Sequence, residues 1–114
     1  MGTMSLRVYD EMIEMVRNVS QLARVVEKHD SDLARQMRRA STSVPLNFCE
    51  GIYSRGRNRE ARLQNSMGSA KETFASLDVS AAAQYLTRAA VQPELKRLDG
   101  IVAVLYTLVH KTRR

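Results

Sequence analysis

The stretch VYDEMIEMVRNVSQLARVV, residues 8–26, places an apolar residue at alternating intervals of four and three positions. The members of this seam are Val8, Met12, Met15, Val19, Leu22 and Val26. The spacing is that of a and d positions in helices that pack nearly parallel to a neighbour. The stretch therefore predicts an amphipathic helix that needs partner helices of the same kind.

Three further segments repeat the pattern. Residues 32–54 carry a seam of Leu33, Met37, Ala40, Val44, Phe48 and Ile52. Residues 59–86 carry Leu63, Met67, Ala70, Phe74, Leu77, Ala81 and Tyr85. The segment that starts at Pro93 carries Leu95, Leu98, Val102, Leu105 and Val109. Four seams with short connections predict an all-α protein, an antiparallel up-down-up-down four-helix bundle.

Turn and capping residues predict where these helices begin and end. Asp30 or Ser31 suits the N-cap of the second helix. Gly56 suits a left-handed C-terminal position, Asn58 the next N-cap, and Pro93 the first position of the fourth helix. We assign residues 8–112 to a single domain and residues 1–7 to a disordered or vector-derived N-terminus.

The third and fourth helices carry more apolar residues than one seam needs. The additional residues are Ala75, Val79, Ala82, Leu86, Ile101, Val104 and Leu108. A single bundle would leave these second stripes in water, so they favour self-association. Gly100, which weakens its helix, is expected to permit a close contact.

Positive charge is concentrated in two places. The net charge is +6, and residues 35–62 hold seven arginines against two glutamates, while residues 101–114 hold three bases and no acid. Clustered arginine is typical both of a solvated helix face and of a surface that binds polyanions. The candidate nucleic-acid-binding residues are Arg35, Arg38, Arg55, Arg57, Arg59 and Arg62.

The stretch STSVPLNFCEGI, residues 41–52, combines a helical apolar rhythm with residues that weaken helices. Pro45 lacks an amide proton and is expected to kink the second helix. The hydroxyls of Ser41, Thr42 and Ser43 are placed to bond the carbonyls that the proline frees. Gly51 would let a neighbouring backbone approach closely.

Four polar residues of the same helix share one face. Arg39, Ser43, Asn47 and Glu50 are spaced by four, four and three positions. Two interpretations remain open for this stripe. One is an internal hydrogen-bond network, and the other is direct ligand binding by Asn47 or Glu50. On the third helix, Gly68 and Ser69 are expected to allow close packing.

The motifs RRASTSVPLNFCEG and MGSAKE together resemble those of the 23S rRNA intervening-sequence proteins, a family of small four-helix bundles. The matching residues are Arg39, Ala40, Ser43, Pro45, Asn47, Glu50, Gly51, Gly68, Ser69 and Glu72. The resemblance covers residues 8–110, and Phe48 and Cys49 depart from the usual Ile-Ala pair.

The resemblance implies a bacterial protein whose copies assemble into a ring, typically a homopentamer. It also implies kinship with the accessory protein of diversity-generating retroelements, a basic barrel that binds nucleic acid and a reverse transcriptase. The resemblance does not make this chain part of a ribosome.

The sequence gives little support to catalysis, and we expect no enzyme, cofactor or metal. His29 and His110 read as surface or capping residues, and Cys49 has no histidine near it in sequence. There is no Glu-x-x-His pair and no phosphate-binding glycine loop. The single cysteine excludes an internal disulfide, and no apolar run has the length of a membrane span, so a cytoplasmic setting is the simplest expectation.

Two functions remain open at this stage. The first is binding of RNA or DNA through charge and shape, with little sequence specificity. The alternative is an oligomeric scaffold for a protein partner, in which the arginines meet an acidic surface or keep the assembly in solution.

Overall fold

The computed structural model describes residues 2–112, apart from the side chains of residues 4, 5 and 112. These residues form four helices and no strand: α1 (Thr3–Glu27), α2 (Ser31–Ile52), α3 (Gly56–Ala82) and α4 (Arg88–Thr112). They lie along the 44 Å long axis of a particle that measures 22 × 19 Å across. The all-helical bundle expected from the four seams is therefore the fold.

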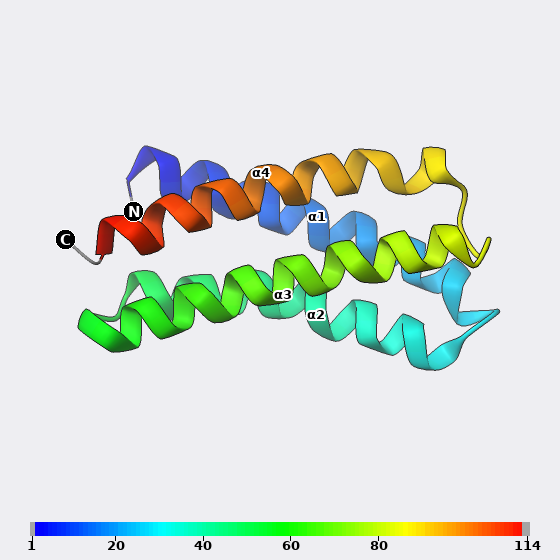
Figure 1. The fold of residues 1–114 in the computed structure, drawn as a ribbon, viewed down its shortest axis with the longest axis horizontal. Helices are drawn as coiled ribbons and strands as arrows, with labels where there is room; N and C mark the ends of the chain where they lie inside the picture. The colour runs from blue at the N-terminus through cyan, green and yellow to red at the C-terminus, as the bar shows by residue number, and fades with distance from the viewer. Residues whose placement is uncertain (1, 113–114) are drawn as a thin grey trace.

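Figure 1 follows the chain along the bundle, with the colour running away from the N-terminus along α1 and back along α2. Both described chain ends lie at the same end of the bundle as the turn between α2 and α3. The turns from α1 to α2 and from α3 to α4 lie at the opposite end. The most extensive contact joins α2 to α3, and the least extensive of the four main contacts joins α1 to α4.

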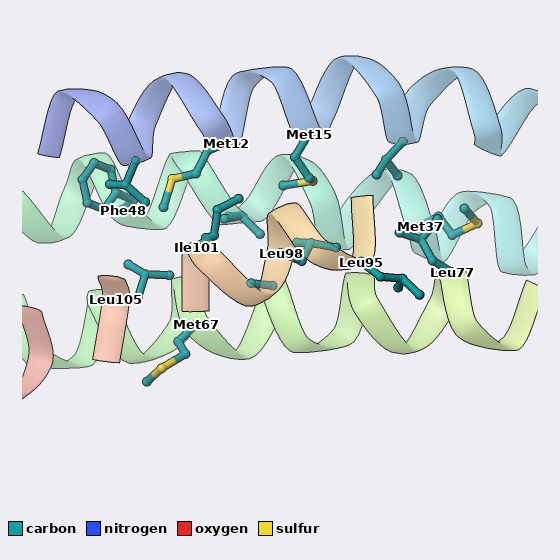
Figure 2. Packing of buried hydrophobic residues seen from close by; sticks show 14 of the residues in the cluster. Met12, Met15, Met37, Phe48, Met67, Leu77, Leu95, Leu98, Ile101 and Leu105 are labelled. Atoms are coloured by element: carbon teal, nitrogen blue, oxygen red, sulfur yellow. The ribbon is translucent and has the colours of Figure 1, made fainter. Parts of the chain in front are cut away.

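The predicted seams form the core. Every residue of the first seam is buried except Leu22, which is half-buried against the others. Figure 2 shows Met12 and Met15 of α1 pointing toward the side chains of α2 and α4, beside Phe48 and Leu98. Methionine side chains are flexible and fill irregular gaps, which suits a core that contains no tryptophan.

The second apolar stripes divide between core and surface. Ile101 and Leu108 are buried and Val104 is half-buried, so the expectation that the α4 stripe lies in water is wrong. A heptad seam misses these residues because α4 packs against both α1 and α3 and so buries a wider face. On α3, Val79 is 53% exposed and Ala75 and Ala82 are exposed.

Leu86, also assigned to the α3 stripe, is buried in the connection after α3. The chain there turns back at Gln84, whose φ is 67°. This turn brings Leu86 onto the core cluster instead of leaving it on the helix surface.

Two helix starts differ from the sequence prediction. α4 begins at Arg88, so Pro93 lies inside the helix and not at its first position. The Thr87 hydroxyl accepts a hydrogen bond from the amide of Ala90 at 3.1 Å and caps the helix earlier. The added turn buries Val91 completely, which offsets part of the roughly 3 kcal/mol that an internal proline costs. α1 begins at Thr3, five residues before the predicted domain boundary at residue 8.

The turns confirm one predicted cap and correct another. Asp30 accepts a hydrogen bond from the amide of Leu33 at 3.0 Å at the start of α2. Gly56 adopts the left-handed conformation with φ of 59°, but it is the first residue of α3 and does not end α2, whose C-cap is Tyr53. Asn58 does not cap α3, because it lies within the first turn and donates to the hydroxyl of Ser54 at 2.9 Å.

Pro45 lies within an uninterrupted α2 and is buried. The neighbouring hydroxyls do not bond the carbonyl that the proline frees. Ser41 and Thr42 donate instead to the carbonyl of Arg38, at 3.1 and 2.9 Å. A helical serine or threonine hydroxyl reaches three or four residues back, so the carbonyl of residue 41 lies out of reach of all three. The kink itself stays a prediction.

At Gly51, α2 packs closely against Leu63 of α3. A Cβ atom at this position would lie 2.9 Å from Cδ2 of Leu63 and 3.3 Å from its amide nitrogen. A Cβ atom at Gly68 or Gly100 would meet no neighbouring side chain or helix within 4 Å. The expected close contacts at those two glycines are therefore absent, since both face outward from the described residues.

Gly51→Leu is expected to lower the free energy of unfolding by about 1–3 kcal/mol, because the new side chain must displace Leu63 or separate the two helices. Gly100→Ala is the matched control. It fills open space in a helix and should raise stability by about 0.5–1 kcal/mol. Thermal unfolding followed by circular dichroism measures both, and an unchanged melting temperature for Gly51→Leu would contradict the close approach.

Candidate nucleic-acid interface and motif groove

The polar stripe of α2 faces a groove of about 680 Å³ between α2 and α3. Arg39, Ser43, Asn47 and Glu50 line it from α2. Ser69 and Glu72 line it from α3, so the two sequence motifs meet across one groove. The helical spacing predicted the α2 side of this site, whereas its juxtaposition with α3 follows from the packing.

A hydrogen-bond network ties the two helices together inside the groove. The hydroxyls of Ser43 and Ser69 lie 2.8 Å apart. The amide nitrogen of Asn47 donates to the Ser43 hydroxyl at 2.8 Å and to the Ser43 carbonyl at 3.0 Å. Since both hydrogens of the Asn47 amide are used within the protein, this residue acts first as a structural link.

The charged members of the stripe lie at the edges of the groove. Arg39 and Glu72 are exposed and form no ion pair within the described residues. Glu50 pairs with Arg62 of α3, with 3.1 Å between Oε2 and Nε. This pair is solvent-exposed, and such pairs add at most about 1 kcal/mol to stability.

Pro45, Gly51 and Gly68, the other motif residues, do not line the groove. Pro45 and Gly51 are buried in the packing of α2, and Gly68 is exposed on α3. The motif thus serves two physical tasks: close packing of the helices and a polar lining beside it.

A stripe of small hydroxyl residues on α3 escaped the sequence analysis. Its buried members are Ser66, Thr73, Ser76 and Ser80. Ser66 donates to the carbonyl of Val44 across the interface at 2.7 Å, and Ser80 contacts the sulfur of Met37 at 3.7 Å. The signal was present in the spacing of residues 66, 69, 73, 76 and 80, which alternates by three and four as an apolar seam does.

Glu94 is a further buried polar residue that the sequence analysis missed. It accepts hydrogen bonds from Asn18 of α1 at 2.9 Å and from Arg97 at 3.1 Å. Arg97 also pairs with Glu11, and these carboxylates raise the pKa of its guanidinium against the opposing effect of burial. The network links α1 to α4, the pair with the least extensive of the four main contacts between helices.

The six candidate arginines form two groups at opposite ends of α2. Arg35 pairs with Asp32 at 2.9 Å and Arg38 with Glu27 at 2.6 Å, near the α1–α2 turn. About 20 Å of helix separates Arg38 from the α2–α3 corner. The other four arginines gather at that corner, as expected from their closeness in sequence.

Within the corner the arginines have different surroundings. Arg59 is partly buried and donates to the carbonyls of Gly51 and Ile52, at 3.4 and 3.3 Å, which closes the end of α2. Arg62 pairs with Glu50. Arg55 and Arg57 are exposed and form no ion pair within the described part of the chain. Of the four corner arginines, these two are the most open to solvent.

The two histidines and the cysteine, which the sequence analysis did not assign to catalysis, lie outside the groove and the basic corner. His29 stacks on Tyr85 and His110 packs against Tyr106. Burial raises the pKa of the Cys49 thiol, which disfavours the reactive thiolate. Among the described residues, no three His, Cys, Asp or Glu side chains lie close enough together to hold a metal ion, and no helix is long and apolar enough to cross a membrane.

The chain is thus an all-helical four-helix bundle with a polar groove between α2 and α3 and a basic corner where those helices meet. It belongs to the 23S rRNA-intervening sequence protein family, whose sequence profile matches residues 4–107. No curated protein matches it.

A solved structure shares the fold. It is the crystal structure of a protein with unknown function from the S23 ribosomal protein family of Bacteroides thetaiotaomicron. The TM-score is 0.80 at 20% sequence identity, over 90% of this chain and 97% of that chain.

A double-mutant cycle measures the groove network. Ser43→Ala and Asn47→Ala should each lower the free energy of unfolding by about 0.5–1.5 kcal/mol. The double variant should lose about 0.5–1 kcal/mol less unfolding free energy than the two single variants lose together, because the two side chains share a hydrogen bond. Asn65→Ala, at an exposed site on α3, is the control and should change stability by less than about 0.5 kcal/mol. Strict additivity in urea unfolding would refute the shared bond.

Cys49 is expected to react slowly with iodoacetamide in the folded protein. Its raised pKa keeps the thiol protonated near neutral pH, so the alkylation rate should climb only at a pH above that of an exposed cysteine. Unfolding in guanidinium should raise the rate at pH 8 by about tenfold or more. Mass spectrometry gives an unambiguous readout because the chain has one cysteine. Equal rates for folded and unfolded protein would disprove the expectation.

Proposed function

We propose that this protein is a non-enzymatic oligomeric four-helix bundle that binds RNA or DNA in the cytoplasm. The observation that carries the proposal is a pair of exposed arginines at the α2–α3 corner, Arg55 and Arg57, that form no ion pair with any described residue. An arginine that already forms an ion pair must break it before it binds phosphate. An unpaired arginine binds phosphate without that cost and offers a bidentate donor.

The corner also lies at the end of the bundle where α4 ends (Figure 1). Lys111, on the last turn of α4, is exposed there. Acidic residues at the opposite end pair with Arg35, Arg38 and Arg88, so much of the charge at that end is compensated within the chain. This distribution supports phosphate binding at one end of the molecule, through charge and shape and with little sequence specificity.

In the proposed assembly each protomer is an antiparallel up-down-up-down bundle bent at Pro45, and five copies form a ring. Apolar surface supports association: Leu46 is 65% exposed and Val79 is 53% exposed. A largely apolar groove of about 800 Å³ also runs between α1 and α4, beside Val8, Ile101 and Val104. A ring would repeat the basic corner around its rim and multiply weak phosphate contacts.

Replacement of Arg55 and Arg57 by glutamate is expected to abolish most retention of bulk RNA at low salt. The slope of log affinity against log salt is negative, and each lost phosphate contact makes it shallower by about 0.7–0.9. The double variant should therefore show a slope that is shallower by about 1.5. Filter binding from about 50 mM to about 500 mM salt measures the slope, and wild-type affinity should fall steeply over this range.

The matched control is Arg24→Glu with Lys28→Glu, which makes the same charge change at exposed positions near the other end. Light scattering verifies that subunit number is unchanged in both variants. An equal loss of RNA retention in the control would show that net charge alone, and not the basic corner, determines binding. Wild-type affinity that is independent of salt would contradict the proposal, and capture of a protein partner with no nucleic-acid defect would favour the scaffold.

A further inference from the structure

Two exposed aromatic rings lie at the end of the bundle that carries the basic corner. Tyr53 follows the last residue of α2 and is 78% exposed. Tyr106 lies near the end of α4 and is 54% exposed. The α2–α3 turn and the end of α4 occupy the same end in Figure 1, so segments distant in sequence come to one end of the bundle.

Tyr53 and the two unpaired arginines share a stretch of five residues. Arg55 follows Tyr53 at the N-cap of α3, Arg57 lies in the first turn of that helix, and Gly56 between them adopts a φ of 59°. Tyr53 is the most exposed of the large hydrophobic residues, although a ring of this size gains free energy by burial. The turn therefore presents an aromatic face and two phosphate-binding groups together.

Tyr106 has a comparable setting on α4. Its ring packs against the ring of His110, with centroids 3.9 Å apart and an interplanar angle of 57°. Both residues are exposed, and Lys111 follows them. The contact with His110 restrains the tyrosine ring while more than half of its surface stays open to solvent.

The other two tyrosines are covered. Tyr85, at the opposite end, stacks in parallel on His29 with a centroid distance of 5.1 Å and is half-buried. Tyr9 is half-buried against the core. Exposed tyrosine is therefore confined to the end that also holds the unpaired arginines.

We propose that this end binds single-stranded nucleic acid, with Tyr53 and Tyr106 stacked on unpaired bases while Arg55 and Arg57 hold the phosphates. This inference rests on the nucleic-acid binding proposed above and names the class of strand. A duplex hides its base faces within the stack, whereas an unpaired strand exposes them to aromatic side chains. Stacking tolerates every base, which agrees with little sequence specificity.

The test compares a labelled 20-nucleotide oligouridine with a labelled 20-base-pair RNA duplex by fluorescence anisotropy at fixed low salt. Tyr53→Leu combined with Tyr106→Leu should weaken binding of the single strand by about tenfold or more, within the range of base–aromatic stacking. Binding of the duplex should change by less than about twofold, and the salt slope on both probes should stay as in wild type, because no phosphate contact is lost.

Tyr53→Phe combined with Tyr106→Phe is the matched control, since it keeps both rings and should keep single-strand affinity. Equal loss on both probes, or no loss on either, overturns stacking but leaves charge-based binding intact. A wild-type protein that binds neither probe overturns both proposals. A changed subunit number in the leucine variant would place these rings in a contact between copies and also overturn the inference.

Discussion

The close approach of α2 and α3 is the constraint on which the rest of the structure depends. Gly51 has room for no side chain because Leu63 occupies the space where a Cβ would lie. Small hydroxyl residues extend the contact along α3, and two of them, Ser66 and Ser69, bond to α2 across it. Small residues let helix backbones approach, and each buried hydroxyl must find an acceptor in return. Both conditions are met here, since no buried side-chain nitrogen or oxygen atom of the described residues lacks a partner.

The same contact places the polar and charged groups. It sets the α2 motif opposite Ser69 and Glu72, which creates the groove, and it brings Glu50 within reach of Arg62. It also positions Arg59 to bond the carbonyls at the end of α2. Within the described residues Arg55, which precedes α3, and Arg57, in its first turn, form no ion pair. Thus one packing arrangement both fixes the fold and selects which arginines meet the solvent.

The two ends of the bundle differ in chemistry for a related reason. At the α1–α2 turn, Glu27 and Asp32 lie close to arginines and compensate them, and Tyr85 stacks on His29. At the α2–α3 corner the sequence offers few acids, so arginine and tyrosine side chains stay exposed. This asymmetry gives the protein one end at which exposed arginines occur together with exposed tyrosine rings, and it supports the assignment of nucleic-acid binding to that end.

The sequence by itself determined the number and type of the helices and most of the core. The seams of α1 and α2 were predicted correctly because a period of three and four is a local property that each helix satisfies alone. Asp30 as a cap and Gly56 at a left-handed position were predictable for the same reason, as were the shared faces of Arg39, Ser43, Asn47 and Glu50.

The tertiary structure decided what depends on neighbours. It buried Ile101 and Leu108 because α4 contacts two helices, and it drew Pro93 into α4 because Thr87 caps the helix and Val91 fills the core. It assigned partners to Arg35, Arg38, Arg59 and Arg62 and left none to Arg55 and Arg57. A sequence gives the charge and the face of each residue, but ion pairing and burial depend on distances between helices, which only their packing sets.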